Sequence, residues 1–586
     1  MSDTINFTIN GEAHEVGAGG EITATTTLQK YLHGQFLTGT KGTCLEGSCG
    51  ACIVVADIPD PNSGDRWSGA VNSCLVPILA CDGWQITTVE GLGNQKDGLH
   101  VIQDTLAKKS GSQCGYCSPG FVMKMYGLTK SQPTWTEEDI ESHIDGGNLC
   151  RCTGYRPILQ AFKSIPITKT QAGKGGCCRG GGGGCCRQPG NKKVKSDAKV
   201  KSIVIGGATW YYPTTLEDLK TTLAGLAADT KYQIVCGDTV KAVYKSDGPY
   251  TAFIYTRMIP DMSRVVIAND SMVIGADVSI TRLISELSEA ADSLSGFAYL
   301  KNIAETWRAV ASTSVRNMGS WGGNIAAKVL HPEFPSDIFL GLLVAGAVIT
   351  TGGPDGSLEK YNLEELLEVD LVGRRRVILD VVLTPASEDT VVRTFKIPPR
   401  PSNTHAQVNA GFRLQVDATN AHTVTGSPII AYGGVNPAFV RAKATEEALK
   451  GMSLEDEVVL QGALEVLAGE VIPDNNPEDA SPEYRVALTQ NLLYKTILGI
   501  IGDAAASTFT SGATNIIRPN SSAKQTFDQN TDVWPLAEPV MKLEAPIQCS
   551  GEAEFIELMP RISQEHYGWF VTSTQANATI VSVDAT

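Results

Sequence analysis

Cysteine residues are distributed very unevenly along this 586-residue chain. Of the fifteen, nine lie before residue 153, four lie between residues 177 and 186, and only Cys236 and Cys549 follow. A secretory signal has a basic segment followed by an apolar one, and the residues that begin with Met1-Ser2-Asp3 lack this pattern. We therefore expect no secretory signal and a cytoplasmic location. Because a reducing compartment disfavours disulfides, we expect the clustered cysteines to be metal ligands or redox groups.

The first group of four cysteines has a spacing that is typical of one kind of site. Cys44, Cys49 and Cys52 follow the pattern C-x4-C-x2-C, and Cys74 comes after 21 intervening residues. This is the plant-type arrangement of thiolate ligands for a [2Fe–2S] cluster, and the glycines of the segment would let the loop curl around the cluster. Four unrelated buried cysteines or a zinc site are the alternatives. Zinc favours two C-x2-C pairs, and this group has only one.

The residues around this group predict a small α+β unit. Thr4–Ile9 and Glu12–Val16 alternate apolar and polar residues, and Asn10-Gly11 between them is a strong hairpin signal. Thr25–Tyr31 predicts a short helix, and Ala51–Ala56 predicts a strand.

A second group consists of Cys114 and Cys117, then Cys150 and Cys152 after 32 intervening residues. The intervening chain has helical apolar spacing over Pro119–Thr129 and an N-cap with an acidic first turn that begins at Thr136. Two helices would present two short cysteine loops at neighbouring ends, which suits a pocket of four thiolates. The spacing alone leaves zinc open as the metal.

The sequence around these cysteines resembles a known family. Gln113-Cys-Gly-Tyr-Cys-Ser-Pro-Gly120 and Gly147-Asn-Leu-Cys-Arg-Cys-Thr-Gly-Tyr-Arg-Pro157 are similar to hallmark segments of the xanthine dehydrogenase and aldehyde oxidase family of molybdo-flavoenzymes. The resemblance implies a β-grasp plant-type ferredoxin domain over residues 1–90 and a four-helix domain over residues 91–168. Each would hold one [2Fe–2S] cluster, and Gln113 would lie between the second cluster and molybdopterin. The implied ligands are Cys44, Cys49, Cys52, Cys74, Cys114, Cys117, Cys150 and Cys152.

Residues 169–202 are rich in glycine, cysteine and lysine and show no apolar periodicity. We therefore expect a flexible, solvated linker. Its four cysteines could bind zinc or copper, although vicinal cysteines rarely ligate one tetrahedral ion. Their role stays open: Cys177, Cys178, Cys185 and Cys186.

From residue 203 the pattern changes to strands alternating with helices, and no G-x-G-x-x-G segment supports a Rossmann site. Two glycine-containing segments, near residues 237 and 322, together resemble the family's FAD domain, of the type shared with vanillyl-alcohol oxidase. The resemblance implies an FAD-binding domain over residues 203–384, with backbone N–H groups of two loops cradling the pyrophosphate. The implied FAD-binding residues are Ile234, Cys236, Gly237, Asp238, Thr239, Ser320, Gly323, Asn324, Asp337, Ile378 and Lys396.

The chain departs from the family pattern at three places. Asp238 replaces the usual asparagine, and a carboxylate beside a pyrophosphate is repulsive unless it turns away. The segment from Asn324 to Ser336 is longer than in xanthine dehydrogenases and resembles the aldehyde-oxidase-like branch of insects and their relatives. Phe395–Arg400 lacks the basic-acidic continuation of NAD-using members, so we expect oxygen rather than NAD as the electron acceptor.

Residues 385–505 resemble the C-terminal α+β subdomain of the family's flavoprotein. We expect an antiparallel sheet with helices on one face and a closing helix over residues 482–501. Leu543–Phe555 resembles the entry to the molybdenum-binding half, so residues 506–586 are expected to be a linker and a truncated start of that half. Its strands would lack partners and pack poorly. A fragment is the favoured interpretation and a natural short form the alternative.

Taken together, the resemblance implies an α+β multidomain oxidoreductase chain that forms the electron-transfer half of a molybdenum hydroxylase. Electrons would pass from the molybdenum centre through the 114–152 cluster and the 44–74 cluster to FAD, and then to oxygen or NAD. The alternative is a non-catalytic cluster- or metal-binding subunit without flavin. The substrate, aldehyde or purine, would be decided in the missing half, which also forms most of the family's homodimer contacts.

Charge and hydropathy exclude two classes of partner. The net charge of −15 repels phosphate backbones, so nucleic acid is not an expected partner. The longest apolar stretch, Ile338–Ile349, is shorter than the roughly 18 residues of a membrane span, so no membrane partner is expected.

Overall fold

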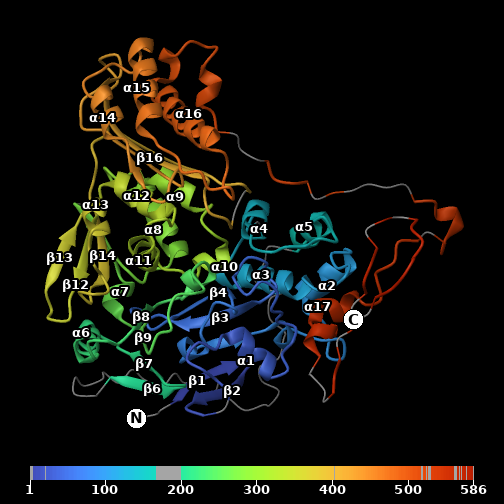
Figure 1. Ribbon diagram of the computed structural model, residues 1–586. Coiled ribbons are helices and arrows are strands. Elements are labelled where there is room, and N and C mark those ends of the chain that lie inside the picture. The colour runs from blue at the N-terminus through green and yellow to red at the C-terminus, as the bar shows by residue number, and fades with distance from the viewer. Residues whose placement is uncertain are drawn as a thin grey trace.

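The computed structural model describes residues 4–165 and 200–584, apart from Gly20, Asp145, Asn269 and residues 401–402, 516–518, 523, 525–528, 537, 560–563, 567, 569, 574 and 576. The four cysteines between residues 177 and 186, and most of the expected linker, therefore lie outside the described residues. The described residues form four sheets with helices packed between and around them (Figure 1).

The first sheet has the strand order β2-β1-β5-β3-β4, with β1 and β5 parallel and the other neighbours antiparallel. The predicted hairpin is confirmed, because Asn10 and Gly11 take the positive φ angles that its turn requires. Helix α1 begins three residues later than predicted, because the Thr27 side chain caps it by accepting a hydrogen bond from the Lys30 N–H. The elements are β1 (Thr4–Ile9), β2 (Glu12–Gly17), α1 (Leu28–Gly34), β3 (Ile53–Pro59), β4 (Arg66–Asn72) and β5 (Gln85–Thr87).

Four helices follow, and the two that the sequence predicts between the second pair of cysteine loops are present. They are α2 (Val101–Lys108), α3 (Ser118–Ser131), α4 (Glu137–Ile144) and α5 (Arg156–Lys163). One face of β3 and β4 packs on α3, since Ile53 and Ala70 share a core with Phe121. The first sheet and the helices are thereby held together by a continuous apolar core.

The middle of the chain holds two more sheets. One has the order β6-β7-β9-β8, with β9 parallel to both neighbours, and the other is antiparallel with the order β10-β11-β14-β12-β13. Lys201, which the sequence analysis assigned to the linker, begins β6. The strands are β6 (Lys201–Ile205), β7 (Ala208–Tyr212), β8 (Tyr232–Val235), β9 (Ala252–Tyr255), β10 (Val265–Ala268), β11 (Ser271–Gly275), β12 (Val348–Gly352), β13 (Leu358–Tyr361) and β14 (Val377–Leu383).

Helices pack around these two sheets and carry the predicted second glycine segment at the start of α11. They are α6 (Leu216–Gly225), α7 (Pro260–Ser263), α8 (Ile280–Ser293), α9 (Leu300–Trp307), α10 (Thr313–Arg316), α11 (Trp321–Leu330), α12 (Asp337–Ala345) and α13 (Leu363–Leu367). Most of the long apolar stretch at residues 338–349 lies in α12, which is buried in the core, and the end of the stretch begins β12.

The next unit is the predicted antiparallel sheet, order β15-β16-β18-β19, with its closing helix α16. Helices cover both faces rather than one, which corrects the prediction. The far face contacts α12, because Asn409 donates to the Asp337 carboxylate (2.8 Å) and Arg413 to the Ala345 carbonyl (3.0 Å). The elements are β15 (Thr390–Ile397), β16 (Val408–Asp417), β17 (Thr423–Val424), β18 (Ile429–Gly433), β19 (Val440–Arg441), α14 (Lys443–Leu449), α15 (Glu457–Glu470) and α16 (Pro482–Ile501).

The segment around residue 545 is a packed helix, not a partnerless strand. Helix α17 (Ala545–Ser550) lies against α2 and α3 (Figure 1). Ala545 and Cys549, four residues apart on one helix face, are both fully buried in the core of the four-helix domain. The expectation of poor packing is therefore wrong for this stretch.

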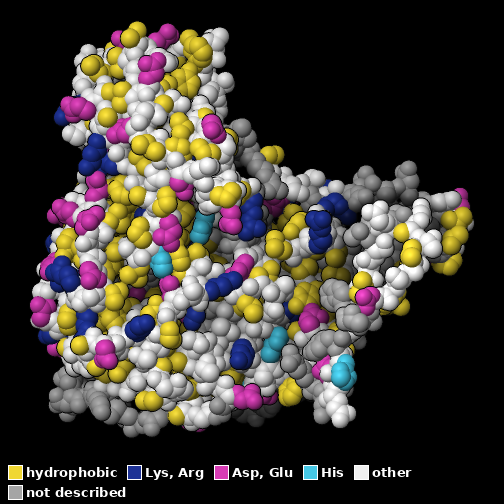
Figure 2. All heavy atoms as spheres, in the orientation of Figure 1, with side chains coloured by type: hydrophobic (Ala, Val, Ile, Leu, Met, Phe, Trp, Pro, Cys, Tyr) yellow, Lys and Arg dark blue, Asp and Glu magenta, His cyan; other side chains and the backbone are white. Residues whose placement is uncertain are grey.

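No helix in the described part of the chain combines the length and the apolar character that a bilayer crossing needs. Acidic and basic side chains are interspersed over the face in Figure 2, and hydrophobic side chains line its central hollow.

The packing of α16 on the C-terminal sheet generates one prediction. Arg485 is fully buried and donates to the Ala480 and Val435 carbonyls and to the Asp474 carboxylate. The substitution Arg485→Leu should lower the free energy of unfolding of this unit by about 3 kcal/mol, because the Asp474 carboxylate and the two carbonyls lose their buried donor. Urea unfolding followed by circular dichroism measures the change. The exposed Lys443→Ala is the matched control, and an Arg485→Leu midpoint equal to that of the control would contradict the prediction.

Candidate functional site

The first four cysteines converge in pairs behind the loop between α1 and β3. The sulfur atoms of Cys52 and Cys74 are 3.3 Å apart, and a hydrogen bond joins the thiols of Cys44 and Cys49. The Asn72 amide also lies 3.5 Å from the Cys52 sulfur. The structure thus brings together all four residues of the predicted first group.

The loop backbone favours the thiolate form of Cys44. The pKa of this thiol is lowered to about 5, because the Cys49 thiol donates to its sulfur and the backbone N–H groups of residues 46, 48 and 49 point at it. Hydrogen bonds to the charged form outweigh the opposing effect of burial. Such a set of N–H donors suits a metal-bound thiolate.

The second group forms two more thiol pairs at the start of α3 and before α5. Hydrogen bonds join Cys117 to Cys150 and Cys114 to Cys152. The Thr153 N–H and hydroxyl lie 3.4 and 3.0 Å from the Cys150 sulfur. Cys150 is buried, whereas Cys114 and Cys152 are exposed.

The pairwise arrangement distinguishes between the two metals that the spacing left open. A structural zinc site needs four ligands on one ion, whereas the thiols of both groups are joined two by two. In a [2Fe–2S] cluster each of the two irons takes two thiolates. Two pairs of thiols with backbone donors around them therefore fit a [2Fe–2S] cluster better than zinc.

The two cysteine loops touch each other. The Leu149 N–H donates to the Cys49 carbonyl (2.9 Å), and the Asn148 amide donates to the Gly50 carbonyl (3.3 Å). Gly50 has a φ of +72°, and a Cβ there would lie 2.1 Å from the Gly147 carbonyl oxygen. Only glycine permits this approach.

A cavity of about 870 Å³ lies between β8 with the loop that follows it and α11, and its far end is at β14 and β15. All eleven residues that the resemblance assigned to FAD line it: Ile234, Cys236, Gly237, Asp238, Thr239, Ser320, Gly323, Asn324, Asp337, Ile378 and Lys396.

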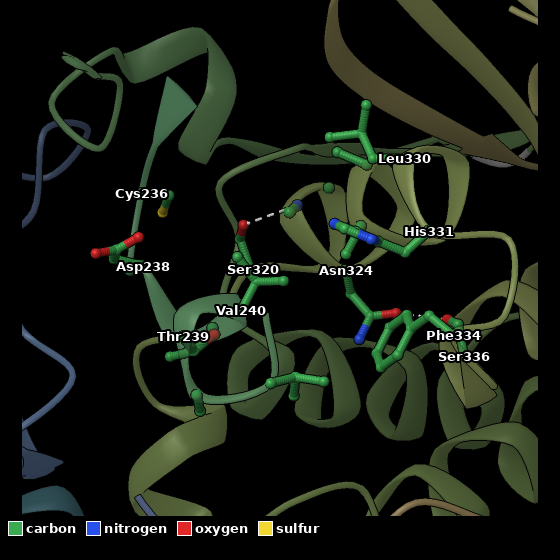
Figure 3. A pocket seen from close by; sticks show the side chains of 18 of the residues that line it. Cys236, Asp238, Thr239, Val240, Ser320, Asn324, Leu330, His331, Phe334 and Ser336 are labelled. Carbon is green, nitrogen blue, oxygen red and sulfur yellow. Dashed lines mark hydrogen bonds between the residues drawn. The ribbon is translucent and has the colours of Figure 1, made fainter. Parts of the chain in front are cut away.

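The two glycine segments form one wall of the cavity. Gly237 lies so close to the second segment that a Cβ would stand 2.0 Å from the Met318 carbonyl oxygen. The Ser320 hydroxyl caps α11 by accepting from the Gly323 N–H (3.1 Å), and Ser336 donates to the Asn324 side-chain oxygen (2.5 Å), as Figure 3 shows. Without a side chain at Gly237, the backbone of the two glycine segments is accessible in this wall, and backbone N–H groups can bind a phosphate group.

The Asp238 carboxylate turns aside, as the sequence analysis required for an anionic ligand. The Gln233 amide donates a hydrogen bond to this carboxylate (2.8 Å). In Figure 3 the Asp238 side chain points away from Asn324 and His331. Burial raises the pKa of this carboxyl to about 6, so it is mostly ionised at neutral pH.

The far end of the cavity holds a buried ion pair. The Lys396 ammonium lies 3.0 Å from the Asp337 carboxylate and donates to the Ala309 carbonyl (3.1 Å), and Asn409 donates to the other carboxylate oxygen. These contacts fix a positive and a negative group beside one end of any bound ligand.

Sequence reasoning missed an aromatic stack at the cavity. His331 lines the cavity and stacks on Tyr244 with ring centroids 3.5 Å apart, and its Nε2 lies 2.9 Å from the Asp247 carboxylate. Neither spacing nor composition signals this contact, because the partners lie in separate loops. The unusual length of the segment after Asn324 was the only sequence feature that pointed to the region.

Gln113 lies away from this cavity, at the second cysteine group. Its carbonyl accepts a hydrogen bond from the Lys542 ammonium. The neighbouring Gln548 of α17 donates to the Cys114 carbonyl (3.2 Å) and accepts from Ser112 (2.8 Å). Sequence reasoning did not identify Gln548, although the segment that contains it was noticed.

Three family models match successive parts of the chain. Residues 88–163 match a [2Fe–2S] binding domain, residues 203–386 an FAD binding domain in molybdopterin dehydrogenase, and residues 393–500 a CO dehydrogenase flavoprotein C-terminal domain. The chain thus contains a [2Fe–2S]-binding and an FAD-binding domain.

Similar proteins align along almost the whole chain. A probable aldehyde oxidase 4 of Oryza sativa subsp. japonica is 29% identical over 99% of this chain and 75% of its own length. An indole-3-acetaldehyde oxidase of Zea mays is 30% identical over 100% of this chain and 46% of its own. A carbon monoxide dehydrogenase structure from Hydrogenophaga pseudoflava aligns with 51% of this chain and 98% of its own at 19% identity and a TM-score of 0.43. Apart from the rice protein, the chain spans about half the length of the first curated relatives it matches.

The close contact at Gly237 generates a prediction. Gly237→Ala should force the two glycine segments apart at a cost of about 1–3 kcal/mol and lower FAD affinity by about tenfold or more. Flavin fluorescence on titration of FAD into the apoprotein measures the affinity. Gly225→Ala, where a Cβ meets nothing within 4 Å, is the control. Equal affinities of the two variants would contradict the role of this contact.

The charge of Asp238 generates a second prediction. With a pKa of about 6, its carboxylate is ionised at pH 8 and protonated at pH 5. Asp238→Asn should therefore bind FAD about fivefold more tightly than the unaltered protein at pH 8, a difference of about 1 kcal/mol, and equally tightly at pH 5. The exposed Asp229→Asn in the same domain is the control. A gain that is the same at both pH values would show that charge is not its cause.

The successive domain matches, the alignment with aldehyde oxidases along the chain, the paired thiols and the glycine-walled cavity lead to one conclusion. The chain belongs to the xanthine dehydrogenase and aldehyde oxidase family.

Proposed function

We propose that this chain is the electron-transfer part of a molybdenum hydroxylase of the aldehyde-oxidase type. Electrons would arrive from a molybdenum centre at the 114–152 site, pass to the 44–74 site, and leave through FAD. The observation that carries this proposal is the direct contact between the two cysteine loops, one of which also reaches the FAD cavity. We assign the first sheet to the β-grasp ferredoxin type, the middle domain to the vanillyl-alcohol-oxidase type, and residues 506–586 to the start of a molybdenum-binding half.

When bound, the [2Fe–2S] groups supply one-electron chemistry and FAD joins it to two-electron chemistry. The chain holds these groups in sequence. The eight cysteines would bind the irons. The hydrogen bond from the Leu149 N–H to the Cys49 carbonyl holds the two cysteine loops in direct contact. Leu149 is adjacent to the ligand Cys150, so this hydrogen bond links two residues that lie at or beside cluster ligands.

The 44–74 site is the one that adjoins the flavin cavity. Glu46 and Ser48, in the loop between the first two ligands, line the cavity. Val315 lines it as well and packs on Cys52 and Cys74. The 114–152 site instead has exposed thiols and contacts α17. This geometry supports entry of electrons at the 114–152 site and exit at the cavity.

We propose oxygen as the electron acceptor. The Phe395–Arg400 segment lacks the basic-acidic continuation of NAD-using family members, which supports oxygen over NAD. The Tyr244–His331 stack lies at the edge of the cavity.

The remaining assignments concern the whole enzyme. We propose an aldehyde as the substrate class, as in the names of the aligned relatives, and a homodimer held mainly by the molybdenum-binding half. Exposed thiolate ligands such as Cys114 and Cys152 favour a reducing compartment, so we place the protein in the cytoplasm.

The proposal predicts that electrons leave only through the flavin. The protein, reduced with dithionite and freed of excess reductant, is mixed with oxygen in a stopped-flow spectrometer, and cluster absorbance is followed. Removing FAD should slow reoxidation of the clusters at least tenfold, because both sites then lose their exit, and added FAD should restore the rate.

Equal rates with and without FAD would contradict the proposed route. A protein that takes up iron but no FAD would instead support the alternative of a cluster-binding subunit without flavin.

A further inference from the structure

A buried and a half-buried cation lie where the four-helix domain, the cysteine loops and the FAD domain join. Lys124 lies on α3 with 0% of its surface exposed, and Arg316 ends the short helix α10. The Lys124 ammonium donates to the Ser314 hydroxyl (3.2 Å), and Ser314 contacts Ser312 (3.2 Å).

The hydrogen bonds that the side chains of Lys124 and Arg316 donate go to neutral carbonyl and hydroxyl groups. Arg316 donates to the carbonyls of Val310 (2.6 Å) and Ala311 (3.3 Å) and to the Thr313 hydroxyl (3.2 Å). Among the residues that the structure describes, no carboxylate forms an ion pair with Lys124 or Arg316. An uncompensated buried charge costs several kcal/mol or loses its proton. Accordingly, burial and the Arg316 charge lower the pKa of Lys124 to about 7.

The surroundings of Lys124 identify the missing anion. Gly120 lies one helical turn before Lys124, and a Cβ on it would stand 2.3 Å from the Gly50 carbonyl oxygen, inside the first cysteine loop. The Lys124 ammonium would be 3.2 Å from a Cβ on Gly147, three residues before Cys150. On its other side, Ser314 is followed by Val315, which packs on Cys52 and Cys74. The cation therefore lies among the loops that would hold the two clusters, and Ser314, its hydrogen-bond partner, precedes the residue that packs on the first.

We propose that Lys124, assisted by Arg316, is the countercharge of the [2Fe–2S] cluster held by Cys44, Cys49, Cys52 and Cys74, and raises the reduction potential of that cluster. This inference rests on the proposed function. A cluster with four thiolates is anionic and gains one more negative charge on reduction, so a nearby buried cation stabilises the reduced form more than the oxidised form. A higher potential at the site that adjoins the flavin cavity draws electrons from the 114–152 site towards FAD.

The test is a redox titration of the intact chain, loaded with iron and FAD and monitored by electron paramagnetic resonance. Lys124→Gln removes the charge, Lys124→Arg keeps it, and Lys130→Gln removes the charge of an exposed lysine on the same helix. A Cys114→Ser variant identifies which signal belongs to the 44–74 cluster.

We expect Lys124→Gln to shift the oxidised–reduced equilibrium of the 44–74 cluster at least tenfold towards the oxidised form, a fall of 59 mV for one electron. The 114–152 cluster should shift less, and Lys124→Arg and Lys130→Gln should keep the original potential. If Lys124→Gln does not fold, Arg316→Gln, at the less buried end of the pair, should lower the same potential, with Arg316→Lys as its control.

An unchanged potential in a Lys124→Gln protein with full iron and flavin content would overturn the inference and leave the proposed function intact. Equal shifts in Lys124→Gln and Lys124→Arg would overturn it as well, because packing rather than charge would then be responsible. An unaltered protein that binds no iron would instead overturn the proposed function.

Discussion

The contact between the two cysteine loops is the constraint on which the rest of the structure depends. It requires glycine at position 50, where a Cβ would overlap the Gly147 carbonyl, and at position 120, where α3 presses on the same loop. With backbone against backbone, the Leu149 N–H reaches the Cys49 carbonyl, and Lys124 is enclosed between the loops and α10. Any side chain at these glycines would separate the two sites and expose the lysine.

The FAD domain is attached to this junction rather than standing apart from it. The Asn317 amide donates to the Ala70 carbonyl of β4 (2.8 Å), and Trp210 of β7 donates to the Ala24 carbonyl (3.0 Å). These buried hydrogen bonds fix the cavity against the first cysteine loop. Packing therefore sets the separation between the first cysteine loop and the cavity.

The sequence predicted those parts of the molecule that local patterns encode. The Asn10-Gly11 hairpin, the helices that follow Cys117 and Thr136, and the closing helix from Pro482 to Ile501 depend on turn residues, caps and periodicity, and all are present. The resemblance also named residues that the fold gathers around a single cavity. Long-range contacts had no local signal: the Gln233–Asp238 bond, the Tyr244–His331 stack and the burial of α17 appear only once distant segments pack together.

The most direct test of this account is the low-temperature electron paramagnetic resonance spectrum of the fully reduced chain. Two [2Fe–2S] clusters in touching loops should give two signals from four irons per chain, each split by the spin of the other. Cys44→Ser and Cys114→Ser should each remove one signal together with the splitting of the other. A single signal, two signals without mutual splitting, or a colourless protein that contains zinc would contradict the central claim that the two cysteine loops form one continuous path to the flavin.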